Sequence, residues 1–177
     1  MNRATLINAV LFQVVWFACV LGGAAGTSLW GALTVLALVA FSAWVGMLRH
    51  DLPFVCAGLF AGFALDTGWI QLGILDYGGA QVAPAWIVLL WCGLGLTLNH
   101  SMQMFTARPL LGGVLAGATA PLSYLGGERL GAVSVPDPVA MAWVGLVWAV
   151  VFWGAFAWAR SGIERRALAA APGAEPA

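Results

Sequence analysis

Three polar residues, Asn99, His100 and Ser101, interrupt an apolar run that is long enough to cross a lipid bilayer. Lipid offers these groups no hydrogen bonds, so they must face protein or water. Histidine titrates near neutral pH, and His100 can shuttle a proton or act as a general base if a carboxylate orients it. Polar side chains inside a membrane usually belong to a functional site. The triplet is therefore the first candidate site, for binding or proton exchange rather than for hydrolysis.

The spacing of neighbouring residues predicts a polar face beside this triplet. If the apolar run is one helix, Asn99, His100 and Gln103 share one side of it, because they are three or four residues apart. Asn8 and Gln13, on the first apolar segment, are expected at the same depth and are candidate neighbours. A structural interpretation stays open, in which these groups form a hydrogen-bond network that joins two helices.

Asp51 is the carboxylate expected at the depth of His100, at the start of another apolar segment. It can orient the imidazole for acid–base chemistry, or it can join His50 in capping its own helix at the membrane surface. The two histidines can also share a metal. One aspartate and no HExxH spacing make that signal weak, so the sequence predicts no metal site and no cofactor.

A second polar layer is expected nearer the other side of the membrane, around Asp66 and Tyr124. Gly58, Gly62 and Asp66 recur every four residues on one predicted helix, and Gly117 and Tyr124 lie seven apart on another. Small-xxx-small faces let membrane helices approach closely, so both polar side chains are expected to extend from packing seams into the interior. They are candidates for ligand binding or proton exchange. Tyr124 can equally cap a buried Asp66 and simply hold two helices together.

The elements that position these residues are about six transmembrane helices. The sequence is 62% hydrophobic and 8% charged, against roughly 25% charged residues in a soluble domain. Arginine, proline and glycine divide it into apolar segments of about membrane-spanning length, at 5–25, 29–48, 52–72, 84–105, 109–127 and 139–159. We therefore predict an all-α polytopic membrane helix bundle. A transmembrane helical domain at 1–160 is followed by a flexible cytoplasmic tail at 161–177.

The arginines predict the orientation of this bundle. All seven basic residues are arginine, and with six spans and a cytoplasmic N-terminus every one except Arg129 falls on the cytoplasmic side. This distribution follows the positive-inside rule and places both termini in the cytoplasm. Four tryptophans are then expected near the outer interface, Trp30, Trp69, Trp86 and Trp143, and two near the inner one, Trp44 and Trp158, as in an aromatic belt.

Several function classes are disfavoured by the sequence. The formal net charge is zero and the arginines are spread along the chain, so no basic stripe exists to bind nucleic acid. No Walker loop, GxSxG elbow or GxGxxG motif is present. The two three-helix halves do not resemble each other, so the sequence does not reveal an inverted-repeat transporter.

Three stretches, at 8–17, 83–101 and 120–133, resemble a known family. They contain Ala-Pro-Ala-Trp and Thr-Leu-Asn-His-Ser in the second, and Ala-Pro-Leu-Ser-Tyr and Gly-Gly-Glu-Arg-Leu-Gly in the third. The chain resembles the uncharacterised bacterial inner-membrane family known as domain of unknown function 2878. Members of this family look to be encoded often beside enzymes that modify membrane fatty acids, such as cyclopropane-fatty-acid-synthase-like proteins. The resemblance therefore implies a function connected with lipids. The resemblance implies no catalytic residues, and Glu128 stands where a small residue is expected.

Three functions stay open for a multi-pass protein of the bacterial inner membrane. The first is binding or accessory handling of a modified lipid or lipid-like small molecule, in a cavity lined by Gln13, Asn99 and His100. The second is a small proton-coupled transporter in which Asp66 and His100 titrate in turn. The third is a membrane-embedded lipid-modifying enzyme that uses His100. The expected partners are membrane lipid and a lipid-like ligand, without nucleic acid, and a homo-oligomer or another membrane partner stays open.

Overall fold

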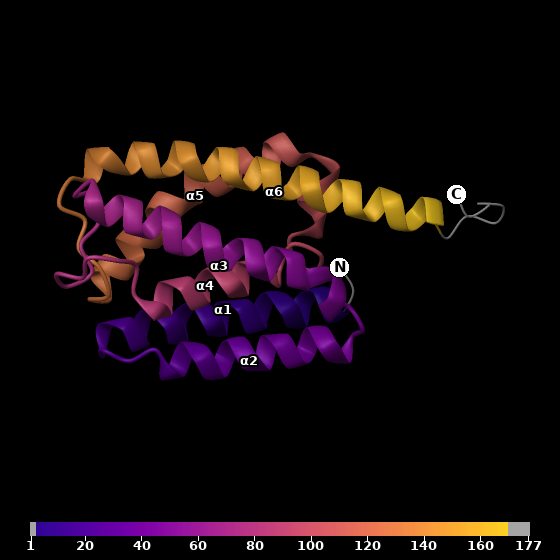
Figure 1. Ribbon diagram of the computed structural model, residues 1–177, viewed down its shortest axis with the longest axis horizontal. Helices are drawn as coiled ribbons and strands as arrows, with labels where there is room; N and C mark the ends of the chain where they lie inside the picture. Colours follow the sequence, from indigo (N-terminus) through magenta and orange to yellow (C-terminus); the bar gives the residue numbers. More distant parts are fainter. Residues whose placement is uncertain (1–2, 170–177) are drawn as a thin grey trace.

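The computed structural model describes residues 3–169. Within them the chain forms six α-helices whose axes lie roughly along one line, so that the helices form a bundle (Figure 1). In chain order they are α1 (Arg3–Ala24), α2 (Leu29–Trp44), α3 (Leu48–Gln71), α4 (Ala85–Gly95), α5 (Pro109–Arg129) and α6 (Met141–Ala169). Two short 3-10 helices, η1 (Gln103–Ala107) and η2 (Pro138–Ala140), precede α5 and α6. The predicted all-α class is confirmed.

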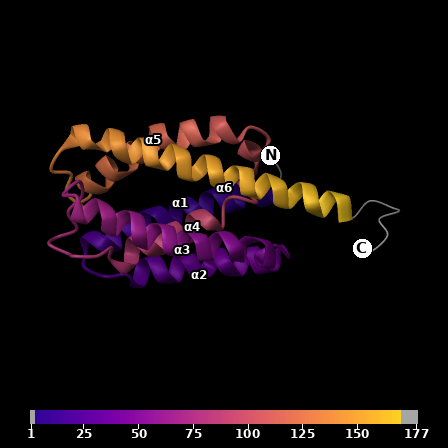
Figure 2. The same ribbon diagram turned by 45° about the horizontal axis from the view of Figure 1, so that its top comes forward.

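The helices pack as three hairpins, α1–α2, α3–α4 and α5–α6. Helix α4 is the central element, because it packs on α1 and α2 as well as on α3. Figure 2 shows α5 and α6 together on one side of the molecule, with α2 and α3 on the other. Every residue from Trp91 to His100 is buried, so the core surrounds the second half of α4 and the turns that follow it.

Four segments are long and apolar enough to cross a membrane: α1, α3, α5 and a stretch at 138–168 that contains α6. Large apolar side chains are exposed on the outside of the bundle, among them Leu36, Phe60, Leu110 and Leu146. A soluble monomer rarely exposes apolar patches of this extent. These features indicate a multi-pass membrane protein. Helices α2 and α4 are shorter, with 16 and 11 residues.

Helix α4 ends at Gly95, so the prediction of one continuous helix over 84–105 is wrong. In a continuing helix the His100 amide would donate to the Leu96 carbonyl. Instead the Leu96 carbonyl accepts from Asn8 Nδ2 at 3.0 Å, and the His100 amide donates to the Thr97 carbonyl at 2.9 Å. Irregular backbone within a membrane is stable only where protein or water satisfies it. The turns from 96 to 102 meet this condition because the buried core surrounds them.

Glycines set the close approach of α3 to α4 and of α5 to α6. A Cβ atom on Gly95 would lie 2.6 Å from the carbonyl oxygen of Phe54, and one on Gly58 would lie 2.6 Å from that of Trp91. Gly117 meets the backbone of α6 in the same way. The predicted small-residue seams on α3 and α5 are therefore present, and they face α4 and α6.

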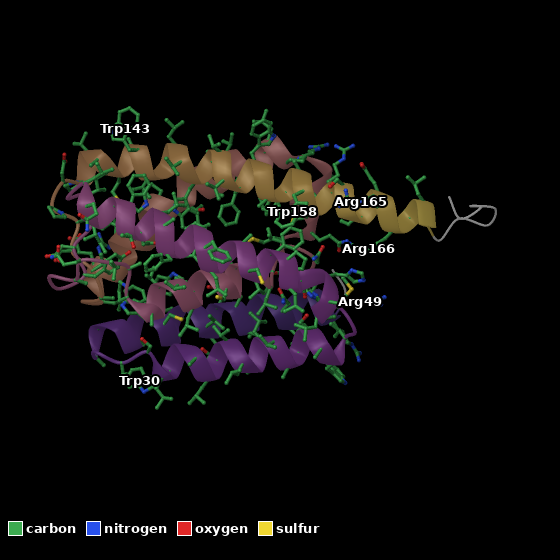
Figure 3. The ribbon with its side chains drawn as sticks, in the orientation of Figure 1. Trp30, Arg49, Trp143, Trp158, Arg165 and Arg166 are labelled. Carbon is green, nitrogen blue, oxygen red and sulfur yellow. The ribbon has the colours of Figure 1, made fainter. Side chains whose placement is uncertain are left out.

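The two ends of the bundle differ in side-chain chemistry. Figure 3 shows Arg49, Arg165 and Arg166 gathered at one end and Trp30 and Trp143 at the opposite end. Helix α6 continues past residue 160 and ends at Ala169, so residues 161–169 of the predicted flexible tail are helical. The remainder of that predicted tail, 170–177, lies outside the described residues.

Candidate functional site

The buried carboxylate of Asp51 organises a polar cluster at the arginine-rich end of the bundle. Ser42 Oγ donates to its Oδ2 atom at 2.5 Å, Asn99 Nδ2 donates to Oδ1 at 2.9 Å, and His100 Nε2 lies 2.8 Å from Oδ2. We call these four residues the Asp51 network. Its members come from α2, α3 and the turns after α4. The carboxylate orients the imidazole, as the sequence suggests. It is 0% exposed, so the interpretation of Asp51 as a surface cap is wrong.

The Asn99 amide has one unfilled acceptor. Its Nδ2 atom also donates to the carbonyl oxygen of His50 at 3.2 Å, and both of its neighbours are acceptors, which fixes the orientation of the amide. Its Oδ1 atom is buried and accepts no hydrogen bond within the described residues.

Asn8 holds the irregular turns in place from α1. Its Oδ1 atom accepts from the Ser101 hydroxyl at 2.7 Å and from the Ser101 amide at 3.3 Å, while Nδ2 donates to the Leu96 carbonyl. The predicted proximity of Asn8 to the triplet is therefore present. Both ends of its amide are occupied by backbone or side chain, so Asn8 positions the turn.

The two candidate glutamines lie apart from this cluster. Gln13 on α1 and Gln103 in η1 are exposed. The predicted shared face of Asn99, His100 and Gln103 requires a continuous helix and is wrong for that reason. No side-chain hydrogen bond in the described part of the chain connects either glutamine to the Asp51 network.

The second buried carboxylate, Asp66, accepts from three aromatic residues. The Tyr77 and Tyr124 hydroxyls donate to its Oδ1 atom at 2.5 Å and 3.0 Å, and Trp91 Nε1 donates to Oδ2 at 2.7 Å. These four residues form the Asp66 network. It joins α3, α4, α5 and the loop between α3 and α4. The pairing of Asp66 with Tyr124, which the seams predict, is present.

Tyr77 is a member of this network that sequence reasoning does not find. It lies eleven positions after Asp66, in a loop, and neither helical spacing nor a motif points to it. Burial, and then the nearby Asp66 carboxylate, raises the pKa of the Tyr77 phenol well above its ordinary value. The phenol therefore remains protonated and keeps donating at physiological pH. Trp91 is also missed as a partner, although the burial of a tryptophan commonly requires an acceptor for its N–H group.

The two networks are separate. Asp51 and Asp66 are 15 residues apart on α3, which corresponds to about 22 Å along a helix. Within residues 3–169 no hydrogen bond runs from one network to the other. In the same residues no group of three histidine, cysteine, aspartate or glutamate side chains is placed to hold a metal ion.

An apolar cleft of about 180 Å³ lies between α3, α4 and α6. Twelve apolar residues line it, and we call it the α3–α6 cleft: Phe54, Ala57, Gly58, Ala61, Trp91, Leu94, Gly95, Leu98, Val151, Phe152, Ala155 and Trp158. Ala57 and Trp158 are exposed, so the cleft opens on the outer surface of the bundle. The sequence predicts a cavity lined by Gln13, Asn99 and His100, but none of the three lines this cleft.

The Asp66 network fixes one wall of the cleft. The Trp91 ring, whose N–H donates to Asp66, packs against Trp148 with ring centroids 4.6 Å apart and against Phe152 at 6.3 Å. Because its indole nitrogen is anchored, the Trp91 ring presents an apolar face to the cleft. Asp66 therefore positions a cleft residue without lining the cleft itself.

A polar pocket of about 130 Å³ adjoins the cleft at the arginine-rich end of the bundle. It is the arginine pocket, and α3 and α6 supply its lining: Arg49, His50, Pro53, Phe54, Trp158, Ala159, Gly162, Arg165 and Arg166. Phe54 and Trp158 line both spaces, and their ring centroids are 4.6 Å apart. Figure 3 shows the three arginines and Trp158 at this end. The cleft and the pocket are therefore neighbours that share two aromatic side chains.

Comparison with known proteins identifies the family. A family model described as "Protein of unknown function (DUF2878)" matches residues 5–154. The chain belongs to this family. The match to the DUF2878 model includes both polar networks and ten of the twelve cleft residues, but it ends before the cleft residues Ala155 and Trp158 and before Arg165 and Arg166. Neither a search of curated proteins nor a search of solved structures finds a match to the chain.

Proposed function

We propose that this DUF2878 protein binds a membrane lipid in the α3–α6 cleft, as an accessory or lipid-handling protein of the bacterial inner membrane. The observation that supports the proposal is that the α3–α6 cleft and the arginine pocket adjoin each other and share two lining residues. An apolar cleft opens on the bilayer-facing surface, and a cationic pocket adjoins it at the end of the same two helices. An amphiphile with one acyl chain and one polar head has the same two-part chemistry.

The cleft suits an acyl chain because its walls are apolar and partly built from small residues. Ala57, Ala61 and Ala155 leave space between larger side chains on α3 and α6. Sites for small molecules are commonly apolar, with a few polar groups that fix the orientation of the ligand. In this protein the polar groups lie at one end of the cleft, where the head group of a lipid would emerge.

The geometry of the Asp51 network supports binding over hydrolysis. Ser42 donates to the Asp51 carboxylate, and His100 contacts the same oxygen, so the serine is not activated by the imidazole. A nucleophilic triad requires the serine next to the histidine and the acid behind it. His100 also does not line the α3–α6 cleft. The network joins α2, α3 and the turns after α4, which favours a structural role for it.

The proposal includes the orientation predicted from the sequence, with both termini in the cytoplasm. The gathering of Arg49, Arg165 and Arg166 at one end supports this orientation, because cytoplasmic ends of membrane proteins are enriched in basic residues. The arginine pocket would then face the inner leaflet.

Photolabelling tests the proposal. The protein is reconstituted in nanodiscs with a phospholipid that carries a diazirine in its acyl chain, and the labelled residues are identified by mass spectrometry. We expect labels on cleft residues of both α3 and α6. Ala155→Trp, which fills the cleft, should abolish these labels.

Ala157→Trp is the matched control, because Ala157 is exposed on α6 two residues away and does not line the cleft. It should label like the wild type. Labelling spread evenly over all exposed helix faces, and unaffected by Ala155→Trp, would show that lipid surrounds the bundle without a specific site.

A further inference from the structure

We infer that the lipid is anionic and places its phosphate in the arginine pocket, an inference that rests on the proposed lipid binding. The pocket brings Arg49 from the start of α3 together with Arg165 and Arg166 from the end of α6. These residues are more than a hundred positions apart in the sequence, and the fold alone brings them together. The chemical class that they fit is an acyl-chain lipid with a net negative head group, in which no cationic group such as choline offsets the charge of the phosphate.

The three arginines have no carboxylate partner in the described part of the chain. The ion pairs found between residues 3 and 169 are His100 with Asp51, and Arg160 with Glu164. Neither pair includes a pocket arginine, and no acidic residue lines the pocket. Planar guanidinium groups bind phosphate oxygens through paired hydrogen bonds. Arg49 Nε donates to His50 Nε2 at 3.3 Å within the pocket, so none of the three guanidinium charges is neutralised by a carboxylate. Three such groups around one hollow favour an anionic occupant.

The shape of the site selects a lipid over a soluble anion. Phe54 and Trp158 form the boundary between the pocket and the cleft, with their rings in contact. A phosphate held by the arginines would place its glycerol and acyl chain against these rings and then along the cleft. Tryptophan prefers the depth of lipid head groups, where its ring is in an apolar region and its N–H is near water. A free phosphate would use the arginines but leave the apolar boundary without a role.

The spacing on α6 explains why its residues meet at one site. Trp158, Gly162 and Arg165 or Arg166 follow one another at intervals of three or four, so they share a face of the helix. Gly162 carries no side chain, and the guanidinium groups of Arg166 and Arg165 lie over it, 3.5 Å and 4.0 Å from where a Cβ atom would stand. Basic pockets on the cytoplasmic side of membrane proteins bind anionic head groups, and each arginine near the surface strengthens such binding roughly five-fold.

The test compares two photoactivatable lipids with the same diazirine-labelled acyl chains, phosphatidylglycerol and zwitterionic phosphatidylcholine. The measured quantity is the ratio of cleft labelling by the two lipids, in nanodiscs of otherwise fixed composition. We expect phosphatidylglycerol to be preferred by the wild type. Arg49→Gln and the double variant Arg165→Gln with Arg166→Gln should each lower the preference several-fold, while labelling by phosphatidylcholine stays unchanged and reports an intact cleft.

Arg160→Gln is the matched control. Arg160 lies on the same helix end, but it pairs with Glu164 at 2.8 Å and does not line the pocket. It should keep the wild-type preference. An equal loss of preference in Arg160→Gln would assign the preference to general surface charge and overturn the inference. A labelling ratio that stays the same in every pocket variant would also overturn it.

A competition experiment distinguishes binding of a lipid head group from binding of soluble phosphate. Inorganic phosphate, added at constant ionic strength, should leave the ratio unchanged because it lacks the acyl chain. Complete competition by inorganic phosphate would overturn the assignment to a lipid head group. Equal cleft labelling by both lipids would reject the anionic preference alone, whereas no cleft labelling by either lipid would reject the proposed function itself.

Discussion

At the scale of single residues, both buried carboxylates lie in networks that tie several helices together. Asp51 is contacted by Ser42, Asn99 and His100, and Asp66 accepts from two tyrosines and a tryptophan. A buried carboxylate is tolerated only when it is paired or hydrogen-bonded. Removing a single hydrogen-bond partner from either network should therefore lower the stability of the protein by a measurable amount.

His100→Ala is expected to destabilise the protein strongly. It removes the contact at 2.8 Å from a fully buried carboxylate, and leaving a buried polar group short of a hydrogen-bond partner costs roughly 1 to 3 kcal/mol. Thermal unfolding in detergent measures the effect. Gln103→Ala is the control, because Gln103 is exposed three residues away and should change the unfolding temperature little. Equal stability of the two variants would mean that the Asp51–His100 contact contributes nothing.

The two tyrosines of the Asp66 network should be energetically coupled. Both donate to Oδ1, so either Tyr77→Phe or Tyr124→Phe leaves that oxygen with one donor, at a cost of about 1 kcal/mol. The double variant leaves Oδ1 with none, and its free energy of unfolding should fall by more than the sum of the single effects. A double-mutant cycle measures this coupling. Strictly additive losses would contradict the shared acceptor.

Part of this chemistry is predictable from residue types and spacing. The recurrence of Gly58, Gly62 and Asp66 predicts that Asp66 faces a helix seam, and the depth of Asp51 makes it the candidate carboxylate for His100, with a surface cap as the alternative. Tyr77 and Ser42 could not be found in this way. One lies in a loop and the other on a different helix, and their positions depend on tertiary packing.

At the scale of helices, the decisive element is the early end of α4. Beyond Gly95 the sequence contains no proline and no acidic or arginine residue before Arg108, so hydropathy predicts one span despite the polar triplet. At the break, the Leu96 carbonyl accepts from Asn8, which is 88 residues away in the sequence. A hydrogen bond between such distant residues cannot be read from local periodicity. The helix count and most helix bounds, in contrast, follow from the arginine, proline and glycine punctuation.

Gly95→Ala tests the close packing of this short helix. A methyl group there would lie 2.6 Å from a backbone carbonyl of α3, which cannot move away as a flexible side chain can. We expect a loss of about 1 to 3 kcal/mol, typical of overpacking. Gly154→Ala is the matched control, because a methyl group at Gly154 would meet nothing within 4 Å and alanine favours a helix. The hairpin packing would be refuted if both substitutions had the same effect on unfolding.

At the scale of the whole molecule, Arg49, Arg165 and Arg166 lie at the opposite end of the bundle from Trp30 and Trp143, which gives the bundle a direction (Figure 3). The arginine counts predict that direction from the sequence alone. They do not predict the arginine pocket, because its two halves meet only when α3 and α6 flank the same cleft. The spacing of Trp158, Gly162 and Arg166 on one helix face is a visible signal for half of it.

Cysteine labelling in spheroplasts tests the proposed orientation. In a variant without the native cysteines, Gln81→Cys in the α3–α4 loop should react with a membrane-impermeant maleimide. Ala107→Cys, at the arginine-rich end, should react only after the membrane is permeabilised. Both positions are exposed, so burial does not explain a difference between them. The opposite pattern would place the arginine pocket in the outer leaflet.

Native mass spectrometry of the protein released from nanodiscs tests the α3–α6 cleft as a lipid site, because it counts the lipid that stays bound. We expect one retained phospholipid on the wild type and on Ala157→Trp, and none on Ala155→Trp, in which the cleft is filled. Retention of no lipid by the wild type, or the same retention by Ala155→Trp, would contradict the assignment of the α3–α6 cleft as a lipid site.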